Sequence, residues 1–284
     1  MQQAIVAKQD LRTLGPAGVS AHVARHGTGA SVELDRICAQ HEAHTALLYW
    51  FTDLPAAIAE ARRTRRPILS LRLLGRLDQA LSCANSRFFR RMLYPHAAIN
   101  NALRDRFVLH WQSVRPVPIV TIDFGNGKRV TRPLTGNSLH LVLDPGGRPV
   151  DALPGLVAPE VFAAQLAQAH RFALADRTQL AAAHGKALAK SAAPPPAPDR
   201  ATAASMIAMT KHVVEAPILR AIAPPSLAHD TRTNLALHAR IHDAFARGRG
   251  VQATSEELVA WIYRDLFLMP PDDPALGLDV ADPL

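Results

Sequence analysis

A cysteine stands at the predicted start of a helix, where its thiol could act as a nucleophile. The helical pattern covers residues 83–93 and begins at Cys83. A thiol reacts as the thiolate, and the amide groups and dipole at a helix N-terminus favour that anion. Nearby positive charge also favours the thiolate, whereas burial opposes it. The arginines close to Cys83 in the sequence are Arg76, Arg87 and Arg90. Cys83 is therefore the candidate catalytic residue, with these arginines as stabilising charges.

Ser86 lies about one helical turn after Cys83, in the segment Cys83-Ala84-Asn85-Ser86. Its hydroxyl can donate a hydrogen bond to the sulfur, but it cannot close an internal disulfide as a second cysteine would. Such a site can form a mixed disulfide with glutathione or a protein thiol, so Ser86 is the second candidate catalytic residue. The alternative is structural, because Ser82 and Cys83 at a helix start are also typical of a simple cap. The sequence leaves both interpretations open.

Cys38, His41 and His44 are spaced three residues apart, which is a ligand-like spacing for zinc. His22 or His26 could supply a fourth ligand. No second cysteine pair accompanies them, and the surrounding sequence is not a zinc-finger pattern. Histidines scattered along a helix are therefore the favoured interpretation.

The C-terminal part holds a second group of metal-binding residue types. His238 and His242 are four residues apart and share a helix face, and His212 and Glu215 are three apart on another predicted helix. Facing helices could bring these side chains together around a metal ion. The alternative is a helical bundle with polar histidines on one face and a core of Ile241, Phe245, Trp261 and Leu266. We favour this alternative and predict no metal and no cofactor.

Composition limits the class of protein. The 284 residues are 48% hydrophobic and 20% charged, which is typical of a globular chain with a substantial core. No stretch approaches the ~20 apolar residues of a membrane helix, and the first residues do not have the pattern of a signal peptide. Two cysteines favour a reducing compartment, so we expect a cytoplasmic protein without a membrane partner. Nucleotide-binding P-loop and GxGxxG motifs and the GxSxG motif of hydrolases are absent.

The positive charge is concentrated in the first two thirds of the chain. The net charge is +8, and residues 199–284 carry 8 basic against 11 acidic residues, so the first 198 residues carry +11. Eleven arginines against three acids lie between Glu60 and Arg106. An acidic protein partner is one interpretation of this asymmetry, and a solvated arginine-rich surface is the favoured one. Without a nucleic-acid motif, we expect no nucleic-acid binding.

Alternating helices and strands would position these residues. Asp53 can cap a helix over Leu54–Arg66, and Pro67 ends it. The apolar run Ile68–Leu74 predicts a central buried strand. The elements expected next are a helix over 83–93 with Phe88, Phe89 and Met92 inward, a helix over Ala97–Asp105 and a strand over Phe107–Trp111.

Two turn signals then predict hairpins, followed by a closing helix. The turns are Gly125-Asn126-Gly127 and Asp144-Pro145-Gly146-Gly147, and the helix is expected over Pro159–His184. The strands expected around the turns are Ile119–Phe124, Arg129–Leu134, Leu139–Leu143 and Pro149–Leu153. This order predicts an α/β fold with a mixed sheet between helices.

Shifts in composition divide the chain into four parts. They are an irregular N-terminal extension (1–45), an α/β domain (46–190), a Pro/Ala linker (191–198) and a helical C-terminal module (199–284). The helices expected in the last part are Ala201–Ile222, Asp230–Arg247 and Ser255–Leu268.

Residues from about Leu48 to Ala169 resemble the thioredoxin-like superfamily. The resemblance rests on Trp50, on the helix, proline and strand of AIAEARRTRRPILSL, on the helix-opening Cys83, and on the helix and strand of RFFRRMLYPHAAINNALRDRFVLHW. The block LHLVLDPGGRPVDALPG resembles the late β-hairpin of that fold. Where such proteins carry Cys-x-x-Cys, this chain has Cys-x-x-Ser, and Gly136-Asn137-Ser138 stands where they usually have a cis-proline. The resemblance implies a thioredoxin-like mixed sheet sandwiched by helices with a monothiol site.

Two function hypotheses follow. The first is an enzyme of thiol–disulfide or mixed-disulfide chemistry, with Cys83 as nucleophile, Ser86 as its hydrogen-bond partner, and a protein or glutathione thiol as substrate. The second is a redox-inactive binding or scaffold protein that docks an acidic partner through its arginine-rich face. The state of Cys83 distinguishes them, because a reactive thiol favours the enzyme and a buried, inert thiol favours the binding protein.

Overall fold

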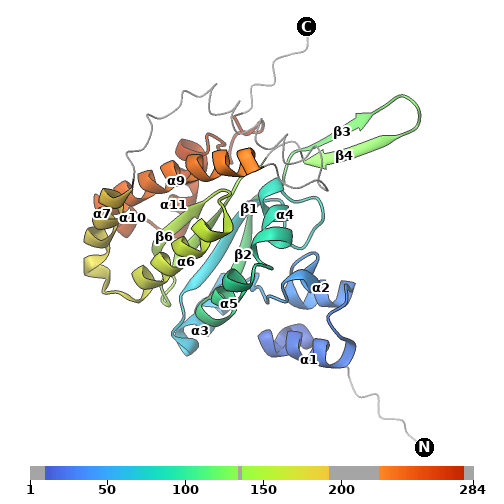
Figure 1. The fold of residues 1–284 in the computed structure, drawn as a ribbon, viewed down its shortest axis with the longest axis horizontal. Helices are drawn as coiled ribbons and strands as arrows, with labels where there is room; N and C mark the ends of the chain where they lie inside the picture. The colour runs from blue at the N-terminus through green and yellow to red at the C-terminus, as the bar shows by residue number, and fades with distance from the viewer. Residues whose placement is uncertain (1–9, 134–135, 192–223, 278–284) are drawn as a thin grey trace, which may run out of the picture.

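Four strands form the central sheet, in the order β2-β1-β5-β6. In this computed structural model the described residues are 10–133, 136–191 and 224–277. The sheet lies between helices (Figure 1), so the predicted α/β class with a mixed sheet is confirmed. The strands are β1 (Ile68–Leu74), β2 (Val108–Arg115), β5 (Ser138–Leu143) and β6 (Pro149–Pro154).

Strand β1 is central and contacts both neighbours along its length. It pairs in parallel with β2, which places Leu71 opposite Trp111, and antiparallel with β5, which places Leu71 opposite His140. Strand β6 pairs antiparallel with β5. Every residue of β1 is buried, because helices cover both faces of the sheet, and this explains why the strand is an apolar run rather than an alternating pattern.

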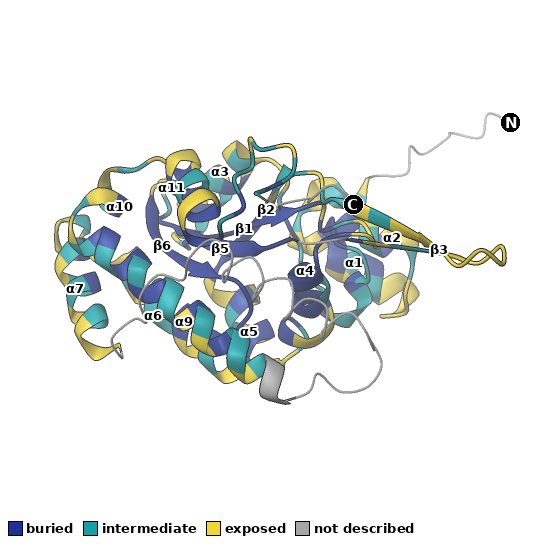
Figure 2. Ribbon diagram, turned by 90° about the horizontal axis from the view of Figure 1, so that it is seen from above, coloured by how far each residue is buried: buried dark blue, intermediate teal, exposed yellow. Residues whose placement is uncertain are grey.

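Helices cover the two faces of the sheet unequally (Figure 2). One face is covered by α3 (Leu54–Thr64) and α11 (Ser255–Trp261), and the other by α5 (Ala97–Arg106), α6 (Pro159–Leu174) and α9 (Pro224–Ala246). Helix α7 (Leu180–Lys190) packs along α9. The register places Asp151 and His140 on the α9 side, whereas Arg72 and His110 point to the α11 side.

The C-terminal helices belong to the same hydrophobic core as the sheet. Ile241 and Phe245 of α9 are fully buried with the residues of β1. Tyr263 lies in a π-helical turn, Ile262–Leu266, that follows α11, and its hydroxyl lies 3.3 Å from the Arg72 carbonyl oxygen and 2.9 Å from that of Asn137. A short helix, α10 (Arg249–Gln252), connects α9 to α11. The helix predicted over Ala201–Ile222 and most of the predicted linker lie outside the described residues.

Local hydrogen bonds account for several element boundaries. Asp53 caps α3 through the amide of Ala56, as predicted, and the helix ends at Thr64 because Arg65 adopts a left-handed conformation. The single helix predicted over Pro159–His184 is wrong, since α6 ends at Leu174. The Asp176 side chain accepts a hydrogen bond from the amide of Thr178 and starts a separate turn before α7. This local cap competes with the continuous helical pattern of the sequence.

The helix predicted over 83–93 is split into α4 (Ala84–Phe88) and a π-helical turn over Phe89–Leu93. Phe88 and Phe89 point inward, as predicted, but Met92 is 54% exposed and Leu93 is buried in its place. The π-helical turn holds an extra residue, which rotates the following side chains about the helix axis. The inward position predicted for Met92 is therefore wrong.

The expectation that residues 1–45 are irregular is wrong for the described part of that segment. It contains α1 (Pro16–His26) and α2 (Val32–Cys38), and Ser31 caps α2 through the amide of Leu34. These helices build a second, smaller hydrophobic cluster of Val19, Leu34, Ile37, Cys38 and Ala43. The N-terminal segment is thus an added helical unit beside the main core.

Strands β3 (Ile119–Asp123) and β4 (Arg129–Pro133) form a hairpin of their own. It projects away from the four-stranded sheet (Figure 1). No helix of the described residues is both long and apolar enough to cross a membrane.

Candidate functional site

Cys83 lies where β1 leads into α4, at the N-cap position of that helix. Its side chain has no exposed surface, and its amide donates to the carbonyl oxygen of Leu74 at 3.3 Å. A sulfur without exposed surface cannot be reached by a second sulfur in this conformation. The predicted position at a helix start is present, and the access that thiol exchange needs is absent at Cys83.

Ser86 is also fully buried, and its described hydrogen-bond partners are oxygen atoms. The Ser86 hydroxyl lies 2.7 Å from Ser82 Oγ and 2.8 Å from the carbonyl oxygen of Cys83. Both contacts are local and hold the first turn of α4. The arrangement therefore fits the structural alternative, in which this serine stabilises a helix start.

The three arginines near Cys83 in the sequence have different surroundings. Arg90 is buried, and its Nη1 donates to Ser82 Oγ at 2.8 Å and to the carbonyl oxygen of Leu77 at 3.1 Å. Burial lowers the pKa of Arg90 to about 10. Arg76 is exposed, pairs with Asp78 at 2.6 Å and lies over the ring of Trp111. Arg87 is half-buried. Arg90 thus fastens the loop before Cys83 to the helix after it.

Gly136 explains the missing proline at the start of β5. A Cβ atom at Gly136 would lie 2.6 Å from Cβ of Cys83. A side chain at this position would therefore collide with the cysteine. The backbone of residue 136 packs directly on Cys83 and contributes to its burial.

The ligand-like spacing in the Cys38 segment does not produce a metal-binding cluster. Cys38, His41 and His44 all lie in the described residues, and their ligand atoms do not gather closely enough for one ion. Cys38 is buried, and burial raises the pKa of its thiol to about 12. The ring of His41 instead contacts Asp35, with 3.2 Å between Nδ1 and Oδ2. Scattered histidines remain the interpretation of this segment.

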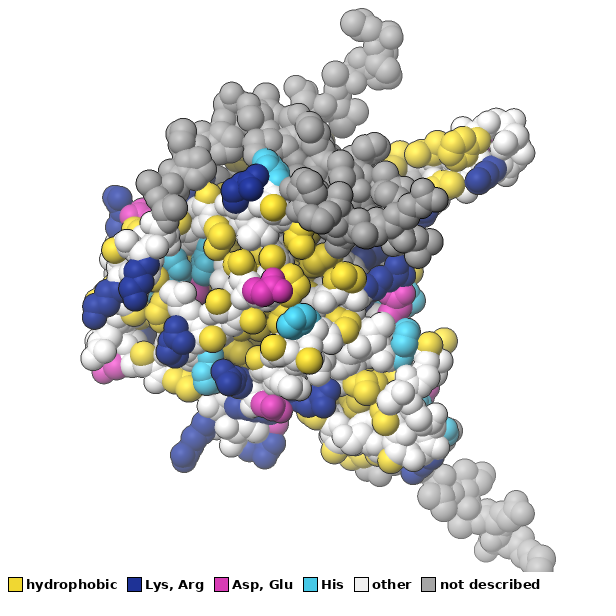
Figure 3. All heavy atoms as spheres, viewed as in Figure 1, with side chains coloured by type: hydrophobic (Ala, Val, Ile, Leu, Met, Phe, Trp, Pro, Cys, Tyr) yellow, Lys and Arg dark blue, Asp and Glu magenta, His cyan; other side chains and the backbone are white. Residues whose placement is uncertain are grey.

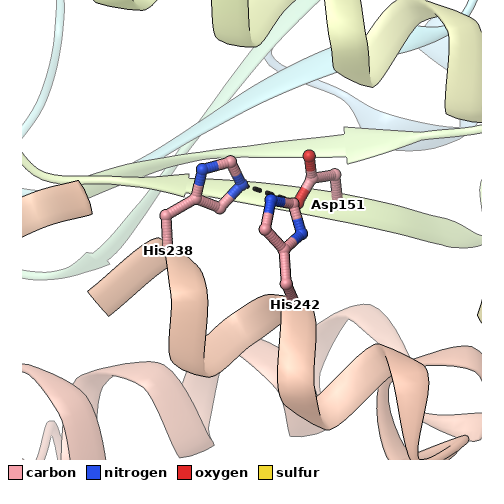
Figure 4. A group of neighbouring side chains, drawn as sticks. All are labelled: Asp151, His238 and His242. Atoms are coloured by element: carbon pink, nitrogen blue, oxygen red, sulfur yellow. Dashed lines mark hydrogen bonds and ion pairs between the residues drawn. The ribbon is translucent and has the colours of Figure 1, made fainter. Parts of the chain in front are cut away.

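A cluster of two histidines and a carboxylate lies between β6 and α9. Among the described residues, the metal-ligating atoms that gather within 4.8 Å of one another belong to Asp151, His238 and His242. Figure 4 shows Asp151 on the strand and both histidines reaching toward it from successive turns of α9. His238 Nε2 donates to Asp151 Oδ1 at 3.0 Å. The shared helix face of the two histidines was predicted from their spacing, whereas Asp151 was not identified. His212 and Glu215 lie outside the described residues.

Burial and neighbouring charge set the protonation of this cluster. Burial alone would raise the pKa of Asp151, but His238, its hydrogen bond and the other histidines outweigh it and hold that pKa below its usual value. Burial lowers the pKa of His242 to about 3, although Asp151 acts in the opposite direction. At neutral pH the cluster therefore pairs a carboxylate with a neutral His242 imidazole.

An apolar groove lies between α1 and the main core, with a volume of about 470 Å³. The two hydrophobic clusters of the molecule face each other across it. Its lining includes Val19 and Val23 from α1 and, on the core side, Leu103 and Phe107, with the charged side chains Glu60, Arg66 and Arg104.

Six arginines lie at the C-terminal ends of α3 and α5, and two of them, Arg66 and Arg104, line this groove. Arg66 Nη1 donates to the carbonyl oxygen of Arg104 at 3.0 Å, so two blocks of the sequence that are 38 residues apart meet here. The six are Arg62, Arg63, Arg65, Arg66, Arg104 and Arg106. Figure 3 shows Lys and Arg side chains gathered along the lower edge of the molecule, where α3 ends.

No protein family model, curated protein or solved structure matches this chain. The function of the chain is therefore inferred from the geometry of its fold and sites. They define an α/β protein with a mixed four-stranded sheet, a buried cysteine, an apolar groove lined by two arginines and one glutamate, and a buried histidine–carboxylate cluster.

Proposed function

We propose that the chain is a binding protein on a thioredoxin-type scaffold, and that it holds an acidic, partly apolar segment of another protein in the groove beside α1. The order of elements supports the scaffold. A helix, β1, further helices, β2 and the β5–β6 hairpin follow one another as the resemblance implies, and all four strands join one sheet. The burial of Cys83 supports binding over thiol exchange.

The groove carries this proposal. The hydrophobic cluster of α1 and α2 and that of the sheet do not pack fully against each other. Apolar side chains from both clusters therefore line an open space. A leucine-sized side chain that leaves water for such a space contributes about 1.5–3 kcal/mol. Association itself costs about 4 kcal/mol or more, so at least two such anchors are needed to offset it.

The rim of the groove selects the charge of the partner. Arg66 and Arg104 line it directly, and Glu60 is the acid beside them. Glu60 pairs with Arg63 at 2.7 Å and lies 3.8 Å from Arg66. The six arginines exceed the acids of their neighbourhood, Glu60 and Asp105, and leave a positive surface. Carboxylates flanking the apolar anchors of a peptide would meet guanidinium groups there.

The test is selection of random peptides, displayed on phage, against the purified chain. We expect enrichment of peptides that combine Asp or Glu with large apolar residues. The variant R66Q/R104Q should bind the selected peptides about tenfold more weakly, because two rim contacts of up to about 1 kcal/mol each are lost. A second variant, V23R, should abolish selection, because the larger side chain would fill the groove.

The matched control is R129Q/R132Q, which removes the same charge from the exposed hairpin. It should bind the selected peptides as the unmodified chain does. Enrichment without acidic residues, or equal weakening by both arginine pairs, would contradict the proposal. Enrichment of cysteine peptides bound through Cys83 would instead favour the thiol enzyme.

A further inference from the structure

We propose that Asp151, His238 and His242 form a binding site for a divalent transition-metal ion, with Zn²⁺ as the ion that fits best. The three side chains come from two elements, β6 and α9, and their ligand atoms already lie within 4.8 Å of one another. Ligands of a tetrahedral zinc ion are about 3.4 Å apart, given metal–ligand bonds of about 2.0–2.2 Å. The widest pair therefore has to close by about 1.4 Å, which side-chain rotation can supply.

An unpartnered carboxylate oxygen points to a missing ligand. Asp151 is fully buried, and its Oδ1 accepts from His238 and from the amide of Ala152 at 2.8 Å. Its Oδ2 has no exposed surface and no hydrogen-bond partner among the described residues. An unsatisfied buried carboxylate oxygen is costly, and a bound cation would satisfy it.

The hydrogen bonds around His242 leave one of its nitrogens open for a metal. His184 Nε2 donates to the carbonyl oxygen of Val150 at 2.9 Å, so His184 Nδ1 carries no hydrogen in the neutral ring. That nitrogen lies 2.7 Å from His242 Nδ1, which must therefore be the donor. His242 Nε2 is left with a free lone pair. A metal-bound histidine almost always donates its other N–H to such an outer partner.

Gln165 is the corresponding outer hydrogen-bond partner of His238. Its side-chain amide lies 3.0 Å from His238 Nδ1, while His238 Nε2 faces Asp151. If a metal replaces the proton on Nε2, the proton moves to Nδ1, and rotation of the Gln165 amide presents its oxygen as the acceptor. The proton moves between the two nitrogens of the ring, so only the tautomer changes.

The donor set selects the class of metal. Two imidazole nitrogens and one carboxylate oxygen of Asp151 offer three ligand atoms, and a water molecule would take the fourth position of a tetrahedral ion. Ca²⁺ and Mg²⁺ prefer sites made entirely of oxygen, whereas imidazole suits zinc and its neighbours. A bound ion would join α9 to β6 across 87 residues of chain.

The test is a titration of the purified full chain, without an affinity tag and after treatment with EDTA, with Co²⁺ as the probe. We expect one equivalent of Co²⁺ to produce the intense visible absorption of a four-coordinate site, and one equivalent of Zn²⁺ to remove it. A chain that binds neither ion overturns the proposal, whatever the variants do.

Variants locate the site. H242Q and D151N should abolish the Co²⁺ absorption, and H184Q, which removes only the outer partner, should weaken binding by about 10–100-fold. The matched control is H44Q, from the separate Cys38 segment, which should bind as the unmodified chain does. Circular dichroism confirms that each variant is folded. Loss of binding in H44Q, or binding retained in H242Q and D151N, overturns the proposal.

Discussion

The Cys83 turn and the Asp151 cluster are equally buried, yet burial has opposite consequences for their chemistry. Both Cys83 and Asp151 have no exposed surface. A thiol needs contact with a second sulfur, and enclosure by Gly136 and the adjacent helix withholds that contact in this conformation. An imidazole binds a metal through the lone pair of its neutral ring, and burial favours the neutral ring.

The hydrogen-bond patterns of the two regions differ as well. Around Cys83, the polar groups of Ser82 and Ser86 bond to one another and to the backbone within one turn. Around Asp151, a carboxylate oxygen lacks a partner among the described residues. Arg90 Nε beside the Cys83 turn is also buried without a partner among the described residues, so the contrast is between the satisfied hydroxyl groups of Ser82 and Ser86 and the unsatisfied carboxylate oxygen of Asp151. Four measurements test this contrast, in order of expected effect.

The largest expected effect is on alkylation of the cysteine. In a C38S variant, Cys83 should react with iodoacetamide about a thousandfold more slowly in the folded chain than in urea, because its sulfur is enclosed. Mass spectrometry of timed samples measures both rates. Rapid labelling of the folded chain would contradict this contrast. If the rate also rose with pH around a midpoint below the pKa of ~8.5 of a free thiol, the enzyme hypothesis would be favoured again.

Removal of the buried carboxylate should be the next largest effect. D151A leaves the buried His238 N–H without its acceptor, and an unsatisfied buried donor costs about 1–3 kcal/mol. Urea unfolding of the EDTA-treated chain at pH 7 measures this change. D243A is the matched control, because Asp243 forms a largely exposed pair with Arg247 and should cost less than about 1 kcal/mol. Equal losses would mean that the cluster is not a coupled unit.

A methyl group at Gly136 should test how tightly Cys83 is packed. G136A should destabilise the chain by about 1–3 kcal/mol, since its Cβ would approach that of the cysteine at 2.6 Å. C83G removes the opposing atom, so the double variant should be more stable than the sum of the single changes predicts. Urea unfolding of the unmodified chain, the two single variants and the double variant gives the coupling free energy of the two substitutions. A coupling of zero would show that the two residues do not press on each other.

Acid should reveal the histidines that burial keeps neutral. Burial lowers the pKa of His140 to about 3, and burial followed by Arg72 lowers that of His110 to about 3 although Asp53 opposes it. The unfolded chain then binds more protons below pH ~6.5, so stability is complete above that pH and falls as pH drops toward 3. Each histidine contributes about 1.4 kcal/mol per pH unit to this fall.

Urea unfolding between pH 5 and 6.5 measures that slope. H140Q should reduce the change in the free energy of unfolding per pH unit by the contribution of one histidine. This holds whatever the variant does to stability at pH 7. The exposed His96 provides the control, since H96Q should leave the slope unchanged. An identical slope in H140Q would mean that this ring protonates in the folded chain.

Sequence alone predicted the elements that depend on local patterns. The run Ile68–Leu74 is β1 without change of boundary, because a fully buried strand must be apolar throughout. The break between α6 and α7 was missed, since the apolar pattern continues across it while Asp176 starts a new turn. The π-helical turn that exposes Met92 was also missed, because the apolar pattern continues across it as well.

The candidate sites were predictable only in part. The spacing of His238 and His242 predicted a shared helix face, but their partner Asp151 lies 87 residues before His238 and is brought near only by the fold. The position of Cys83 at a helix start followed from its neighbours, whereas its burial depends on Gly136, 53 residues later. Long-range packing decides both outcomes and leaves no periodic pattern in the sequence.

The Tyr263 contact with β1 has a consequence for the order in which the chain can fold. The Tyr263 hydroxyl and the Arg72 carbonyl oxygen are 191 residues apart in the chain. At a synthesis rate of about 5–20 residues per second, β1 leaves the ribosome roughly 10–40 seconds before this partner exists. The sheet face beneath α11 is therefore uncovered for most of translation. A nascent chain halted before residue 255 would display that face to chaperones or to other unfinished chains.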